Sequence, residues 1–180
     1  MTILATTMAN EIITHTEMCA REGRNLQRGM HYSSPLGYSV LLMSRRRNAP
    51  YNDRLEDDGA TLIYEGHDVA RSSGVEDPKV VDQPEKYPSG APTENGRFYQ
   101  AAIDFARRRG SPRRVRVYEK IQQGIWSYNG FFHLTDAWRE SDGQRQVFKF
   151  RLAIADEDEG EFLTDLPNGP LIVLGSFQHA

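Results

Sequence analysis

Arginine side chains are concentrated at three places in this sequence of 180 residues, with a spacing that suits contacts to phosphates. The clusters are Arg45–Arg47, Arg107–Arg109, and the trio Arg113, Arg114 and Arg116. Acidic residues gather elsewhere, in the run Asp156–Glu159 and after it, where no lysine or arginine follows Arg151. The formal net charge of −3 therefore conceals a net basic body, which indicates a DNA partner, with a solvated surface as the alternative for each cluster.

A second chemistry that the residues could perform is metal-dependent cleavage of a phosphodiester. The triplet Asp77-Pro78-Lys79 fits the last part of a common nuclease pattern, and Asp57 and Asp58 are further carboxylates. Because Glu56-Asp57-Asp58-Gly59 is equally typical of a polar turn, we favour the turn and expect no catalytic residue. The single cysteine, Cys19, excludes a disulfide within the chain and a cysteine-based zinc site, so we expect no metal and no cofactor.

The chain is 38% hydrophobic and 26% charged, which allows one domain with a sizeable core. Its 180 residues are too few for two such domains. No apolar run approaches the roughly 18 to 20 residues of a membrane-spanning helix, and the first residues do not read as a secretory signal. We therefore expect a cytoplasmic protein without a membrane partner.

The elements that must position these residues follow from periodicity and from turn residues. Residues 8–21 have helical spacing, while residues 38–43 and 61–64 are short apolar strands joined by a long polar loop, 45–59. Long loops in small domains are often functional. Residues 66–92 are rich in Gly, Pro, Ser and Asp and predict an extended excursion over the surface.

The second half predicts one strong helix at residues 95–109, with Asn95 as its cap, followed by strands at 114–118, 131–138 and 146–152. Residues 170–177 could add an edge strand. Trp126 and Trp138 are interpreted as packing residues, and Tyr128-Asn129-Gly130 as a strand end with a tight turn. These elements indicate an α+β fold, a curved sheet or half-open β-barrel with packed helices.

Seven short segments in this order resemble the SRA domain (SET and RING associated, also called YDG), which reads 5-methylcytosine or 5-hydroxymethylcytosine. They are Tyr38–Leu42, Leu62–Gly66, Asp82-Gln83, Thr93–Asn95, Arg114–Val117, Tyr128–Gly130 and Val147–Leu152. The resemblance implies an N-terminal helical extension at 1–25, an SRA or PUA-like domain at 26–155, and an acidic linker and tail at 156–180. It is greatest to a bacterial branch in which such a domain precedes an HNH nuclease domain.

The resemblance also implies a pocket for a cytosine flipped out of the duplex. Tyr51 and Tyr64 occupy the positions of the two aromatics that sandwich the base, and Asp53 that of the carboxylate accepting from the cytosine N4 amino group. Better-known members place this Asp three residues after the Tyr, whereas here it follows by two. His67 is interpreted as a polar contact to the base. The alternatives are a core aromatic for Tyr64, an exposed turn residue for Tyr51 and a plain loop histidine for His67.

Arginines near this pocket are expected to contact the duplex: Arg45, Arg46 and Arg47 at its mouth, Arg28 beside them, and Arg71 reaching toward the gap left by the base. The expected partner is double-stranded DNA with a modified cytosine, read for a modification-dependent restriction system. A homodimer and a nuclease domain in cis or in trans remain open. So do two other interpretations, an RNA-binding PUA-like module and a fragment of an HNH endonuclease.

Overall fold

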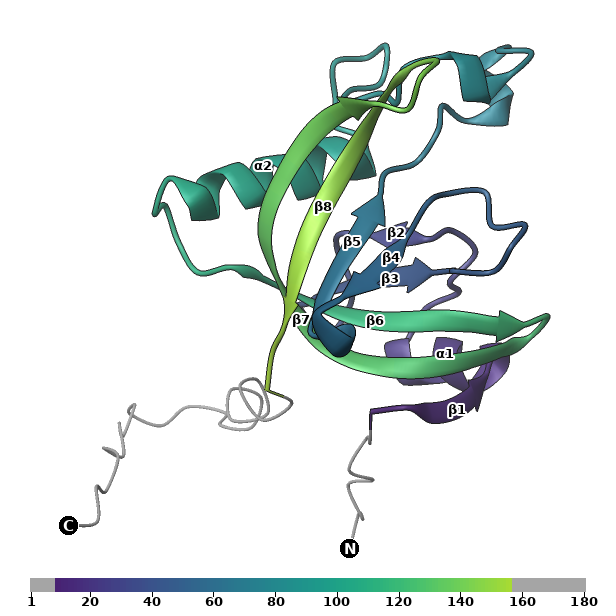
Figure 1. Cartoon of the computed structure of the whole chain (residues 1–180), viewed down its shortest axis with the longest axis vertical. Helices are drawn as coiled ribbons and strands as arrows, with labels where there is room; N and C mark the ends of the chain where they lie inside the picture. The colour runs from purple at the N-terminus through teal and green to yellow at the C-terminus, as the bar shows by residue number, and fades with distance from the viewer. Residues whose placement is uncertain (1–8, 157–180) are drawn as a thin grey trace, which may run out of the picture.

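The strands form one mixed sheet in the order β2-β3-β6-β7-β8-β5-β4, with β1 paired to β7 off this path (Figure 1). The computed structural model of the chain describes residues 9–156. The strands are β1 Glu11–Thr14, β2 Met30–His31, β3 Ser39–Met43, β4 Arg54–Glu56, β5 Thr61–Glu65, β6 Arg113–Gln122, β7 Ile125–Ser141 and β8 Gln146–Ile154. The helices are α1 His15–Glu22 and α2 Glu94–Ala106.

The sheet is curved and open, because its two end strands, β2 and β4, each pair on one side only. Among the strands of residues 9–156, only β3 and β6 run parallel, and the other pairs are antiparallel. This is an α+β architecture, and the predicted fold class is confirmed.

Strand β7 holds the two halves of the sheet together. Its first half pairs with β6 and its second half with β8, so its 17 residues bend across the whole fold (Figure 1). The bend contains a β-bulge, where the register shifts at Asn129 and Gly130 has φ +93°. The tight turn predicted at Tyr128-Asn129-Gly130 is therefore wrong, since a bulge continues the strand where a turn would end it.

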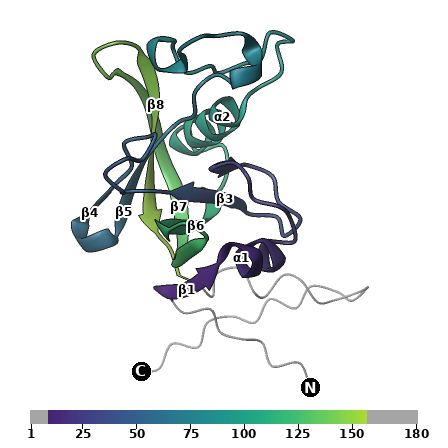
Figure 2. The same cartoon turned by 90° about the vertical axis from the view of Figure 1, so that its right-hand side faces the viewer.

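Two apolar clusters fix the helices at separate places on the sheet (Figure 2). Helix α2 buries Phe98 and Ala102 against the β7–β8 half, and α1 buries Met18 near Tyr118 and Tyr128 of the β6–β7 half. The N-cap of α2 is Thr93, whose hydroxyl accepts from the Gly96 N–H. The prediction of Asn95 as the cap is therefore wrong.

The N-terminal segment differs from its prediction, because residues 11–14 form β1 instead of a first helical turn. Strand β1 completes its hydrogen bonds on the edge of β7, and Thr14 then caps α1 in a capping box with Glu17. The buried Glu22 at the end of α1 pairs with Arg116 at 2.9 Å and accepts from Tyr118 and Tyr38.

The other predicted strands and the second helix are confirmed, although α2 ends at Ala106 and the predicted loop 45–59 contains β4. Strands β3 and β5 match within one residue, while β6, β7 and β8 extend further than their patterns indicated. The strand predicted at residues 170–177 lies outside the described residues. No helix within residues 9–156 has the length and apolarity needed to cross a membrane.

Candidate functional site

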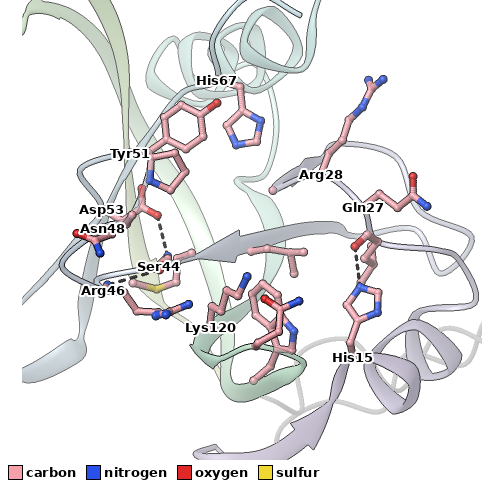
Figure 3. Close-up of a pocket in the computed structure, with 18 of the residues that line it drawn as sticks. His15, Gln27, Arg28, Ser44, Arg46, Asn48, Tyr51, Asp53, His67 and Lys120 are labelled. Carbon is pink, nitrogen blue, oxygen red and sulfur yellow. Dashed lines mark hydrogen bonds between the residues drawn. The ribbon is translucent and has the colours of Figure 1, made fainter. Parts of the chain in front are cut away.

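A cavity of about 730 Å³ opens beside the loop that follows β3 (Figure 3). Five segments from distant parts of the sequence meet there: α1, the turn before β2, the end of β3 with its loop, His67 after β5, and the β6–β7 hairpin. The lining residues include His15, Gln27, Arg28, Ser44, Arg46, Asn48, Tyr51, Asp53, His67, Lys120, Gln123 and Trp126.

The structure brings five of the predicted site residues to this one cavity: Tyr51, Asp53, His67, Arg28 and Arg46. They come from three segments between residues 28 and 67, and Figure 3 shows Tyr51, Asp53 and His67 together on one wall. The sequence indicated Tyr51, Asp53 and His67 by resemblance, and Arg46 also by its place in a cluster of arginines.

His67 lies against Tyr51 and also contacts Tyr64. Its imidazole is parallel to the Tyr51 ring, with 4.7 Å between centroids and 8° between planes. The hydroxyl of Tyr64 lies 3.0 Å from His67 Nε2, and the Tyr64 ring is only 1% exposed. Tyr64 therefore lies in the core next to His67, and the ring that faces Tyr51 is that of His67.

The position of His67 is fixed through its main chain. The buried side chain of Asn95 accepts from the His67 N–H and donates to its carbonyl, at 2.8 and 2.9 Å. Gly29 packs closely against the His67 ring: a Cβ on this glycine would lie 2.7 Å from His67 Nε2 and 2.7 Å from the Tyr64 hydroxyl. Burial lowers the pKa of His67 to about 4, so the ring is neutral at physiological pH.

Asp53 is the carboxylate of the cavity. It is 8% exposed, and its two oxygens accept from the main-chain N–H groups of Ser44 and Glu65, each at 3.0 Å. Burial raises its pKa to about 7, although both hydrogen bonds oppose the shift. Behind it, Glu65 pairs with the buried Lys149 at 2.9 Å. The hydrogen bonds fix the direction of the Asp53 carboxylate, which ionises near neutral pH.

The outer face of Tyr51 is covered by Lys79, which comes from the excursion 66–92. The Lys79 ammonium lies 4.4 Å from the Tyr51 ring centroid, donates to the Pro50 carbonyl and pairs with Asp68 at 2.8 Å. Asp68 in turn pairs with the buried Arg145 at 2.6 Å, and its N–H donates to the Tyr51 hydroxyl. The excursion thus positions the Tyr51 ring, which the sequence did not indicate.

The three consecutive arginines have different environments. Arg45 forms two hydrogen bonds with Glu119, which also accepts from Asn129 of the bulge. Arg46 lines the cavity, and within residues 9–156 it pairs with no carboxylate. Arg47 lines a second, polar hollow of about 480 Å³, which Arg45 and Arg46 also line.

Two further arginines predicted to contact the duplex, Arg28 and Arg71, lie in different surroundings. Arg28 is exposed and lines the main cavity, and its contact with the duplex stays a prediction. Arg71 is exposed on a short 3-10 helix, Arg71–Ser73, and lines neither hollow.

The residues considered for a nuclease are engaged in separate contacts. Asp57 accepts from Thr61 next to β5, whereas Asp77 caps a 3-10 turn and Lys79 covers Tyr51. This arrangement supports the interpretation of residues 56–59 as a turn.

Comparison with solved structures shows the SRA fold. The chain matches the SRA domain of SUVH5 in complex with hemi-methylated CG DNA, with a TM-score of 0.57 and 22% identity over 94% of this chain and 97% of that one. The SUVH5 SRA domain bound to fully hydroxymethylated CG DNA matches equally well, with a TM-score of 0.57 and 21% identity over the same shares. No protein-family model matches the sequence, and no curated protein does.

Proposed function

We propose that this chain binds double-stranded DNA containing 5-methylcytosine or 5-hydroxymethylcytosine and holds the modified base, flipped out of the duplex, in the main cavity. The observation that carries the proposal is the convergence of Tyr51 and Asp53 on one wall of a cavity edged by Arg28 and Arg46. The SRA domains of SUVH5 with the same fold are in complexes with methylated or hydroxymethylated DNA.

The side chains have the chemistry that a flipped cytosine needs. Extrusion costs a few kcal/mol, and each aromatic face returns about 1–3 kcal/mol by stacking. The Asp53 carboxylate can accept from the cytosine N4 amino group, whereas thymine offers a carbonyl at the same place. Arg28 and Arg46 supply the contacts to phosphate, which depend on salt and not on sequence.

The base and the His67 ring compete for one space in this proposal. The imidazole already contacts both tyrosines, so a base can stack on Tyr51 only after the ring has rotated away. Because Asn95 holds the His67 main chain on both sides, the movement is a side-chain rotation and does not require the segment to unfold.

The decisive experiment is a titration with duplexes of one sequence that carry cytosine, 5-methylcytosine or 5-hydroxymethylcytosine at a single position. We expect tighter binding of at least one modified duplex. A fluorescent guanine analogue opposite the modified base should brighten when its partner leaves the stack. Tyr51→Ala should abolish both effects and Tyr51→Phe should retain them, since phenylalanine keeps the stacking face. Equal affinity for all three duplexes would refute the proposal.

The same proposal includes a role as the recognition module of a modification-dependent restriction system, with cleavage performed by a nuclease domain in cis or in trans. The purified chain should then leave modified DNA uncut in magnesium or manganese. Competition between RNA and methylated duplex separates this role from that of an RNA-binding PUA-like module.

A further inference from the structure

The wall of the main cavity across from Tyr51 carries residues that no sequence motif singled out. It is built from the β6–β7 hairpin and α1, and Figure 3 shows Lys120 and His15 on this side. Gln123 and Trp126 complete the wall. Trp126 is 8% exposed, so little of its side chain faces the cavity.

Lys120 is the charged group of this wall. Its ammonium lies 5.8 Å from the centroid of the Trp126 ring, its partner across the strands, and its side chain is partly buried. Within residues 9–156 it forms no ion pair, because the adjacent Glu119 is engaged by Arg45 and Asn129. A partly desolvated ammonium without a counterion is a suitable partner for an anion.

The charge of the cavity as a whole also favours an anion. Three cations line it, Arg28, Arg46 and Lys120, and none of them pairs with a carboxylate in the described part of the chain. Asp53 is the one carboxylate among the lining residues, and each of its oxygens accepts one main-chain N–H, which partly offsets its charge. The cavity therefore attracts an anion to the side away from Asp53.

The size of the cavity leaves room for this anion. A volume of about 730 Å³ lies in the range that encloses whole drug-sized ligands, and one nucleobase beside Tyr51 and Asp53 fills only part of it. A flipped nucleotide brings its sugar and phosphates with it, and these are the anionic groups at hand.

We propose that Lys120, with Gln123 beside it, binds a phosphate of the strand whose base is flipped, so that this contact forms only in the flipped state. The inference rests on the proposed function. It differs from the expected role of Arg46 and Arg47 in the kind of DNA affected, because these two arginines are exposed and can reach any duplex, whereas Lys120 is partly buried in the cavity wall. Lys120 is thus a selectivity residue as well as a phosphate contact.

The test compares Lys120→Met, which keeps the aliphatic stem, with Lys120→Arg, which keeps the charge. Lys86→Met is the matched control, because Lys86 is exposed and lines neither hollow at the site. We expect Lys120→Met to weaken binding of the modified duplex about fivefold and to reduce its salt slope by about one. The unmodified duplex should change less than twofold, and Lys120→Arg and Lys86→Met should resemble the wild type.

The outcomes separate this inference from the proposal on which it rests. If the wild type prefers modified duplexes but Lys120→Met weakens both duplexes equally, or neither, the flipped-state contact is wrong and the pocket stands. If the wild type shows no preference, both fail. A thermal unfolding curve of Lys120→Met that overlays the wild type excludes misfolding, and Lys120→Gln replaces it should the curve differ.

Discussion

The ring of Tyr51 lies parallel to the imidazole of His67 at a centroid distance of 4.7 Å, so the two rings are already in stacking contact. A base cannot enter between them at this separation. The Tyr64 ring, the other aromatic that the resemblance implies, lies 6.1 Å from the imidazole on a tilted plane and is buried. His67 therefore occupies space that the proposed function assigns to the base.

Replacement of His67 by alanine should increase the affinity for modified duplexes by about three- to tenfold. The reason is that a stacked aromatic pair is worth about 0.5–1.5 kcal/mol, which the entering base no longer has to break. The measurement is a titration with modified and unmodified duplexes, the latter expected to stay unchanged. Weaker binding of the modified duplex would instead support His67 as a polar contact to the base.

Binding of the flipped cytosine should depend on pH through Asp53. An ionised carboxylate accepts from the N4 amino group, so binding lowers the pKa of Asp53 below its free value of about 7. The contribution is therefore complete above pH 7 and is lost progressively as the pH falls from 7 toward the lower pKa of the complex. The nearby Glu65 and Lys149 are paired with each other, and His67, with a pKa of about 4, stays neutral over this range.

A binding series between pH 6 and pH 8.5 measures this dependence. Asp53→Asn should bind the modified duplex more weakly at pH 8 and show a flat profile. The prediction is wrong if the wild-type profile is flat or if the slope persists in Asp53→Asn.

Lys79 should affect modified-base binding although it lies outside the cavity. Its ammonium covers the outer face of Tyr51 at 4.4 Å, and an exposed cation–π contact is worth about 0.5–1 kcal/mol. Lys79→Met should therefore weaken binding of the modified duplex two- to fivefold, with little change for the unmodified duplex. Lys86→Met is the control, and an equal loss for both duplexes would indicate a plain phosphate contact for Lys79.

Short-range patterns predicted the strands well, because alternating apolar residues specify a half-buried strand locally. The pattern failed at residues 11–14, where helical spacing was overridden by the free edge of β7, an interaction with residues more than a hundred positions away. The turn predicted at Asn129 was wrong for a similar reason, since only the pairing of β6 with β7 shows that Asn129 is a bulge residue that donates to Glu119.

At the candidate site, too, local sequence indicated some residues and missed others. Tyr51 and Asp53 lie in one short loop, and a resemblance of local sequence was enough to select them. Lys79 and Asn95 contact Tyr51 and His67, each 28 positions away, and Lys120 lines the same cavity as these loop residues from a distant strand. Local sequence marked Lys79 only within a nuclease-like triplet and Asn95 only at a helix start, and it did not mark Lys120, so their places at the site could be found only once the strands were placed.

Glu22 should be the most costly single charge to remove from the fold. It is fully buried, pairs with Arg116 and accepts from two tyrosine hydroxyls, so Glu22→Ala leaves a buried guanidinium without its partner. Breaking a buried pair in this way costs about 3–5 kcal/mol of unfolding free energy. Urea unfolding measures it, with the exposed Glu76→Ala as control. A loss below about 1 kcal/mol would show that water replaces the pair.

Arg45 and Arg46 are adjacent in the sequence but should contribute unequally to DNA binding. Arg45 is held by Glu119 at 2.8 and 3.1 Å, so its charge is compensated, whereas Arg46 lines the cavity and pairs with no carboxylate within residues 9–156. Arg46→Ala should weaken all duplexes about equally and reduce the salt slope by about one, because it removes a phosphate contact. Arg45→Ala should have a smaller effect, since it also frees Glu119 and breaks only an exposed pair. Titrations of both variants at several salt concentrations measure the difference, and equal slopes would show that Arg45 leaves Glu119 to reach the DNA.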